Sequence, residues 1–166
     1  MSRAFVKEGV PEAPLVIPPR PPLPAGVPNY VTPEGLAALR AEKADLDAQR
    51  AALGPDEARE RERLTGLLKG LVERIAAAHV VDPAKVTLDR VRFGATVEVD
   101  DEAGDRRAFR IVGVDEAAGG GGVAGGVAAF TAPIARAVIG KAVGESGELR
   151  TPKGTERLTV VSITRG

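Results

Sequence analysis

The sequence predicts an α+β protein in which an antiparallel helical hairpin precedes an antiparallel β domain with one short helix. Apolar residues recur at helical spacing on both sides of Gly54-Pro55, and from Val86 onward the apolar period changes to two and β-branched residues become common. Eight of the 13 prolines lie before residue 29. We therefore expect a flexible proline-rich tail over residues 1–31, a hairpin over 32–82 with its tip at 54–57, and a β domain over 83–166.

Composition narrows the classes of partner and of chemistry. The 23 basic and 23 acidic residues balance, whereas autonomous binding to nucleic acid or to an acidic membrane needs a concentrated basic patch. The chain has no cysteine, which excludes disulfides and thiolate chemistry. It also has no apolar run as long as a membrane span. We expect a cytoplasmic protein without nucleic-acid or membrane binding of its own, whose partner recognises shape and local charge.

The tail contains the run Pro18-Pro19-Arg20-Pro21-Pro22. Proline lacks an N–H and favours extended backbone in the residue before it, so the tail is expected to be disordered or similar to polyproline II. A spacer and a proline-motif ligand are both compatible with this composition.

The first helix has clear start and stop signals. Thr32 suits the N-cap, Pro33 suits the first helical position, and Gly54-Pro55 ends the helix. Three leucines recur every seven residues, as in a coiled coil: Leu39, Leu46 and Leu53.

The second helix is expected to start after Asp56 and Glu57, whose charges suit a helix N-terminus, and to run to about Ala78. One apolar stripe follows from its spacing: Leu64, Leu67, Leu68, Leu71, Val72 and Ile75. Gly66 and Gly70 fall roughly opposite this stripe, where each costs about 1 kcal/mol relative to alanine. The sequence suggests no role for these two glycines.

The β domain is expected to alternate strands and turns. Strands are expected over residues 91–93, 96–100, 108–114, 127–131, 149–151 and 156–163. Glycine occupies six of the eight positions from Gly119 to Gly126, which indicates a loop, and Pro133 starts a short helix over 132–139.

No catalytic or cofactor motif emerges from the residues. The glycine loop is not followed by the Lys-Ser/Thr pair of a phosphate-binding loop, and His79 has no metal-ligating neighbours at suitable spacing. Asp56 and Glu60 share a helix face at the tip, so they are weak candidates for holding a divalent cation with ligands from a partner. Capping and solubility explain the same carboxylates. We expect no cofactor, no catalytic residue and no metal site of the chain's own.

Several motifs resemble the GreA/GreB family of bacterial transcription elongation factors over residues 30–165. They are Tyr30-Val31-Thr32-Pro33-Glu34-Gly35-Leu36, Val80-Val81-Asp82-Pro83, Val91-Arg92-Phe93-Gly94-Ala95-Thr96-Val97, Ile111-Val112-Gly113-Val114-Asp115-Glu116-Ala117 and Ala132-Pro133-Ile134-Ala135-Arg136-Ala137-Val138-Ile139-Gly140-Lys141. The resemblance implies an FKBP-like C-terminal domain that docks on RNA polymerase at the rim of the secondary channel. It places the docking surface around Thr131, Ala132, Pro133 and Arg136.

In that family the hairpin enters the channel, and carboxylates at its tip help to hold a catalytic magnesium that cleaves backtracked RNA. The tip here, Gly54, Pro55, Asp56, Glu57 and Glu60, lacks the family's acidic motif. Each arm is also about ten residues shorter than usual, which shortens its reach by about 15 Å. The docking segment departs too, because Thr131 and Ala132 stand where the family often has an acidic residue and serine.

These differences favour a polymerase-binding regulator that is not an enzyme and does not stimulate cleavage efficiently, similar to short-hairpin relatives such as Rnk. An active cleavage factor of the GreA/GreB type is the alternative. A more remote one is a peptidyl-prolyl isomerase with an FKBP-type pocket, for which this domain offers only Phe93, Phe109 and Phe130 as aromatic lining.

Overall fold

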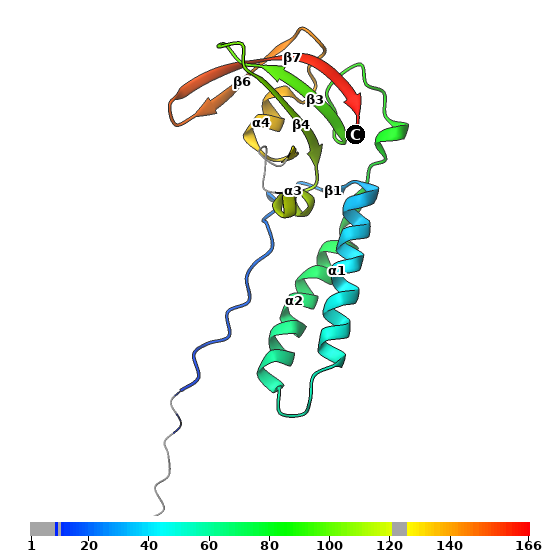
Figure 1. Cartoon of the computed structure of the whole chain (residues 1–166), viewed down its shortest axis with the longest axis vertical. Coiled ribbons are helices and arrows are strands. Elements are labelled where there is room, and N and C mark those ends of the chain that lie inside the picture. Colours follow the sequence, from blue (N-terminus) through cyan, green and yellow to red (C-terminus); the bar gives the residue numbers. More distant parts are fainter. Residues whose placement is uncertain (1–8, 10, 121–125) are drawn as a thin grey trace, which may run out of the picture.

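A helical hairpin stands at one end of the molecule and a curled β-sheet at the other (Figure 1). The structure is a computed structural model that describes residue 9 and residues 11–120 and 126–166. Most of the expected glycine loop, residues 121–125, therefore lies outside the described residues. The predicted α+β class is confirmed, with the hairpin before the sheet.

The hairpin consists of α1 (Pro33–Ala51) and α2 (Ala58–Ala76), each 19 residues long. Thr32 caps α1 as expected, because its hydroxyl accepts the backbone N–H of Gly35 at 2.9 Å. Four leucines on the facing sides are buried: Leu39, Leu64, Leu68 and Leu71. Neither hairpin helix has the length and apolar character of a membrane span, nor does any other helix in the described part of the chain.

Two short strands close the base of the hairpin. β1 (Asn29–Val31) pairs in parallel with β2 (Ala78–Val80), so residues 29–31, which we assigned to the tail, are part of a sheet. The second helix ends at Ala76 rather than near Ala78, because the chain extends there to pair with β1. A strand of three residues is too short to show a period in the sequence, so only its pairing with another segment of the chain reveals it.

The main sheet has the strand order β5-β4-β3-β7-β6. Its members are β3 (Ala95–Asp100), β4 (Arg106–Val112), β5 (Val127–Ala129), β6 (Ser146–Thr151) and β7 (Gly154–Arg165). Neighbours run antiparallel except β4 and β5, which are parallel. We expected a purely antiparallel sheet, and this prediction is wrong at the β5 edge. There α3 (Val114–Gly120) is part of the crossover connection that a parallel pair of strands requires.

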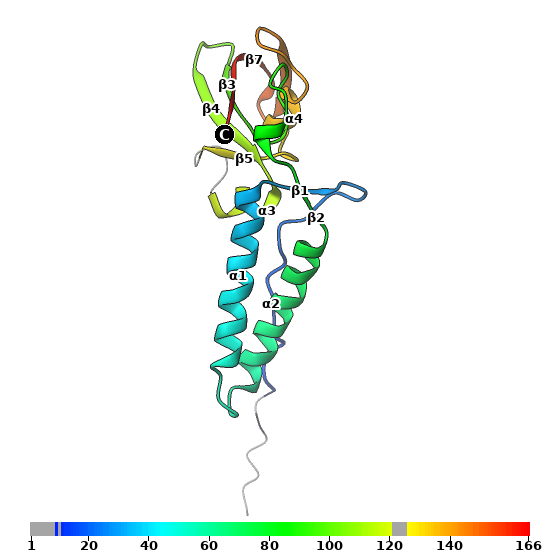
Figure 2. The same cartoon turned by 90° about the vertical axis from the view of Figure 1, so that its right-hand side faces the viewer.

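Two further differences concern individual segments. Residues 91–93 form no strand, although Val91 is fully buried and exchanges backbone hydrogen bonds with Gly140 and Lys141. The domain contains α3 in addition to the expected helix, which is α4 (Pro133–Val138), and a 3-10 turn at η1 (Pro83–Lys85). The view in Figure 2 places α3 between the hairpin and the sheet, where it contacts α1, β1 and β5.

One face of the sheet carries the core of the β domain. Its fully buried large side chains include Val97, Val99, Phe109, Ile111, Leu158 and Val160. Helix α4 adds Ile134, Ala135 and Val138 to this core, which fixes how the helix lies against the sheet.

Candidate functional site

The hairpin tip is held by its own backbone and side chains. The carboxylate of Glu57 accepts the N–H of Gly54 at 2.7 Å, and the Glu57 N–H donates to the Gly54 carbonyl at 3.2 Å. Arg61 donates from Nη2 to the same carbonyl at 2.9 Å. Glu57 therefore closes the turn between the helices, while its neighbour Pro55 is exposed.

The other tip carboxylates differ in their surroundings. Glu60 forms a two-pronged pair with Arg63, at 2.5 Å and 2.9 Å, and this hydrogen bonding lowers the pKa of the Glu60 carboxyl. Asp56 is exposed. Within the described ranges, no group of three or more potential metal ligands comes together at the tip or elsewhere. The tip thus leaves Asp56 as the carboxylate available to a partner, while Glu57 and Glu60 have structural contacts.

Helix α4 presents the expected docking segment at the surface. Ala132 occupies the N-cap in an extended conformation and Pro133 begins the helix, where its missing N–H costs nothing. Pro133 and Arg136 are exposed and lie three residues apart on one helix face. Thr131 precedes them and is half-buried. The structure therefore brings the four residues together at one surface site.

An open hollow of about 350 Å³ lies at the C-terminal end of α4. Ile139, which is 39% exposed, and Phe93 are apolar parts of its wall, and Arg90 and Arg92 add positive charge. Its lining comes from three separate stretches of chain near residues 81–86, 90–93 and 139–140. Sequence reasoning missed this hollow because no local pattern connects those stretches.

The aromatic residues join the hairpin base to the β domain. Tyr30 of β1 lies 5.5 Å from Phe130 and 5.9 Å from Phe93, measured between ring centroids, and 6.3 Å from His79. Phe93 and Phe130 are themselves 5.7 Å apart. Phe109 is instead buried in the sheet core. The three phenylalanines considered for an isomerase pocket therefore divide between the core and this joint.

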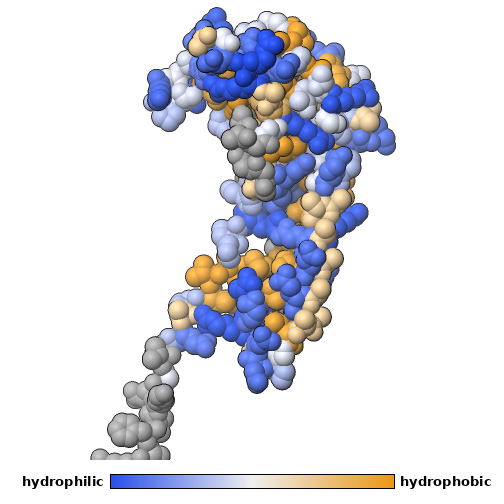
Figure 3. Space-filling model, in the orientation of Figure 1, coloured by the Kyte–Doolittle hydropathy of each residue, from blue (hydrophilic) through white to orange (hydrophobic). Residues whose placement is uncertain are grey.

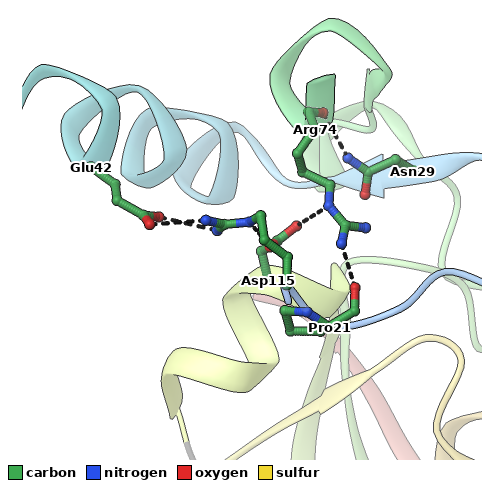
Figure 4. Close-up of polar contacts among 6 residues, drawn as sticks. Pro21, Asn29, Glu42, Arg74 and Asp115 are labelled. Carbon is green, nitrogen blue, oxygen red and sulfur yellow. Dashed lines mark hydrogen bonds and ion pairs between the residues drawn. The ribbon is translucent and has the colours of Figure 1, made fainter. Parts of the chain in front are cut away.

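Asp115 of α3 is the centre of an ion network at the same joint (Figure 4). It accepts from Arg20 Nε at 2.9 Å and lies 3.3 Å from Arg74 Nε, and only 7% of its side chain is exposed. Arg20 also binds Glu42 of α1 at 2.9 Å. Hydrogen bonds to Glu42 and Asp115 raise the pKa of Arg20 against the opposing effect of burial. The network thus links the tail, both hairpin helices and α3.

The neighbouring Glu116 makes a second link. It accepts a hydrogen bond from the Thr32 hydroxyl at 2.6 Å, and Thr32 is fully buried. Arg110 of β4 lies 3.4 Å from Glu34, and the pKa of Glu34 is lowered, mainly by hydrogen bonding to its own backbone and also by Arg110. The adjacent acids Asp115 and Glu116 are visible in the sequence, but the sequence does not indicate which residues pair with them.

The comparisons with known proteins agree on one family. A family model described as "Transcription elongation factor, GreA/GreB, C-term" matches residues 85–165. Transcription elongation factor GreA of Rhodospirillum rubrum is 34% identical over 156 residues, which cover 82% of this chain and 97% of that protein. GreA of Methylobacterium nodulans is 36% identical over 124 residues, covering 74% and 71%. GreA of Thermodesulfovibrio yellowstonii is 36% identical over 64% of this chain and 66% of its own length.

Solved structures show weaker similarity. The crystal structure of GreA factor homolog 1 (Gfh1) of Thermus thermophilus aligns with 20% identity and a TM-score of 0.38, over 82% of this chain and 99% of that one. GreA/GreB from Nitrosomonas europaea aligns with 23% identity and a TM-score of 0.40, over 81% and 98%.

Proposed function

Because this chain belongs to the GreA/GreB family of transcription elongation factors, we propose that it binds bacterial RNA polymerase at the secondary channel and modulates transcription without efficiently stimulating transcript cleavage. It would act in the cytoplasm as a regulator, and any RNA cleavage would be catalysed by the polymerase. Relatives named transcription elongation factor GreA support the general role, and the docking segment and the hairpin tip support the finer one.

The surface of α4 supports the docking part of the proposal. Pro133 and Arg136 offer an exposed rigid ring and a cation on one face, and the hollow at the C-terminal end of the same helix offers apolar area at Ile139. Interfaces commonly combine an apolar centre with arginine near it. Thr131 and Ala132 bring no acidic charge, so this contact would depend on shape and on Arg136.

The contacts of the tip glutamates are the observation that carries the rest of the proposal. Metal-assisted cleavage needs carboxylate oxygens within about 2–2.6 Å of the ion. Glu57 is exposed but hydrogen-bonded to Gly54, and Glu60 pairs with Arg63, which leaves the exposed Asp56 as the acid of the turn available to a partner. Helices of 19 residues are only about 28 Å long. A short arm with one available carboxylate suits occupation of the channel better than metal delivery.

A pull-down of core RNA polymerase tests docking. The wild-type chain should retain polymerase, and Pro133→Asp and Arg136→Glu should each weaken retention at least about tenfold, which is roughly 1.4 kcal/mol. Arg157→Glu, which changes an exposed arginine of β7, serves as the charge-matched control and should bind normally. If the wild-type chain fails to retain polymerase, the proposal is wrong.

RNA length in stalled, backtracked complexes tests the missing cleavage. We expect the chain to leave the rate of RNA shortening at the level of polymerase alone. Shortening that the chain accelerates, and that Asp56→Ala and Glu57→Ala abolish, would instead make it an active cleavage factor.

A further inference from the structure

Residues 12–21 of the proline-rich tail lie along α2. Near the tip, Arg59 pairs with Glu12 at 2.7 Å and donates to the carbonyl of Ala13 at 2.6 Å. Near the base, Arg74 donates to the carbonyl of Pro21. Two arginines of one helix thus hold the two ends of one tail segment. Figure 3 shows apolar side chains gathered on the side of the hairpin where this segment crosses it.

The two glycines of α2 lie between these arginines. Gly66, Leu67 and Gly70 line a hollow of about 340 Å³ together with the segment Ile17–Pro21. A Cβ added at Gly66 would overlap the Cδ1 atom of Ile17, whereas one added at Gly70 would meet no atom within 4 Å. Glycine is unfavourable inside a helix, so Gly66 has a structural reason: it makes room for the Ile17 side chain.

Length and hydrogen bonding both suit an extended proline-rich segment. The eight residue steps from Ala13 to Pro21 span about 25 Å at roughly 3.1 Å per step, and the fifteen steps from Arg59 to Arg74 span about 22 Å at roughly 1.5 Å per step. A polyproline II segment has no internal hydrogen bonds, so its carbonyls are free to accept hydrogen bonds from water or from side-chain donors of a neighbouring element. Arg59 and Arg74 provide such donors at matching positions.

We propose that one stripe of α2, which we call the α2 groove, is a docking site for an extended proline-rich segment, and that residues 12–21 of this chain are its occupant. The α2 groove consists of Arg59, Gly66, Leu67, Gly70 and Arg74. Docking carries Arg20 to the joint, where it binds Glu42 of α1 and Asp115 of α3. The docked segment is a strap that orients the hairpin on the β domain, a role that goes beyond polymerase binding.

Disulfide trapping tests the docking directly, because the chain has no cysteine of its own. Ile17→Cys with Gly66→Cys should cross-link within one chain under mild oxidation. The two γ carbons of Ile17 lie 3.2 and 3.8 Å from a Cβ built at Gly66, so the Ile17 Cβ, one bond away from them, lies close enough for a disulfide after a small shift. Val16→Cys with Gly66→Cys is the control, because Val16 is 79% exposed. We expect the control pair to react at least about tenfold more slowly, and Arg20→Ala to slow the Ile17 pair. Equal rates for the two pairs would overturn the docking.

Alanine substitutions of the two glycines give an independent test. Gly70→Ala should favour the folded state about fivefold in urea unfolding, as expected for an open helical position. Gly66→Ala alone should favour the folded state by less than about twofold, because its methyl group competes with Ile17 for the same space. In a chain that already carries Ile17→Ala, the same Gly66→Ala change should favour the folded state by the full fivefold. Additive effects of Gly66→Ala and Ile17→Ala would show that the two residues do not meet, contrary to the proposal.

Spin-label distances test the orienting role. Labels on Glu62→Cys of α2 and Lys153→Cys of the β6–β7 turn, both exposed, report how the hairpin lies on the β domain. Arg20→Ala should broaden the distance distribution, and Arg40→Ala, at an exposed position of α1, should leave it unchanged. An unchanged distribution in Arg20→Ala would overturn the strap. No polymerase is needed, so these results are independent of the proposed function.

Discussion

Glu57 and Gly54 exchange two hydrogen bonds across the hairpin turn, one from the Gly54 N–H to the Glu57 carboxylate at 2.7 Å and one from the Glu57 N–H to the Gly54 carbonyl at 3.2 Å. This arrangement satisfies both backbone groups of Gly54 next to Pro55. An acid that resembles a metal ligand in the sequence is therefore part of the turn itself. Its substitution should affect folding rather than chemistry.

Glu57→Ala is accordingly expected to lower the free energy of unfolding by about 0.5–1 kcal/mol, the size of a hydrogen bond near the surface. Asp56→Ala, which removes an exposed acid, should change it by less than about 0.5 kcal/mol. Urea denaturation followed by circular dichroism measures both. Equal effects would mean that Glu57 does not close the turn.

Thr32→Val should destabilise the joint by about 1–2 kcal/mol, because it removes the cap of α1 and the donor to Glu116 without changing side-chain volume much. Thr32→Ser keeps the hydroxyl and should retain most of the stability. Urea denaturation compares the two variants. A valine variant as stable as the wild type would mean that the two hydrogen bonds of the Thr32 hydroxyl do not stabilise the joint.

Asp115→Ala should lower the free energy of unfolding by about 3 kcal/mol or more. It removes a nearly buried carboxylate and leaves Arg20 and Arg74 facing each other without their shared acid. Asp89→Ala is the control. Asp89 pairs with Arg92 at a site where 62% of its side chain is exposed, so its loss should leave the unfolding temperature nearly unchanged. Thermal unfolding separates these outcomes, and similar costs would argue against a structural network at the joint.

Gly147→Ala should displace α4. The added Cβ would overlap the carbonyl of Ala137, and backbone cannot move aside as a side-chain end can. We expect a loss of about 1–3 kcal/mol from overpacking, together with weaker retention of polymerase because Pro133 and Arg136 shift. Calorimetry and the pull-down measure these two effects. A stable variant with normal binding would mean that the close packing of α4 against β6 is not required for stability or docking.

The hairpin helices could be predicted from sequence because their signals are local. Thr32, Pro33 and Gly54-Pro55 start and stop helices through neighbours within a few residues, and the leucine spacing repeats over several turns. The short helix at Pro133 was predicted for the same reason. Helix α3 was missed, since its seven residues run into a glycine-rich stretch that indicated only a loop.

The candidate site could be predicted only in part. Pro133 and Arg136 were named through a resemblance of motifs, and the structure places both at the surface. The sequence marked Glu57 and Glu60 as acids at a tip, but it could not tell that Gly54 and Arg63 engage them. Which carboxylate is available depends on side-chain partners, and those follow from the conformation of the turn.

The sequence by itself determined the class of the fold, the hairpin with its turn, and the family, because each depends on local periodicity or on motifs in order along the chain. Tertiary structure alone decided how the hairpin is held on the β domain. The Arg20–Asp115 hydrogen bond spans 95 positions and the Thr32–Glu116 bond spans 84, and β1 meets β2 only after the hairpin has folded back. No pattern of neighbouring residues encodes such contacts, because they form between segments that become neighbours only when the chain is folded.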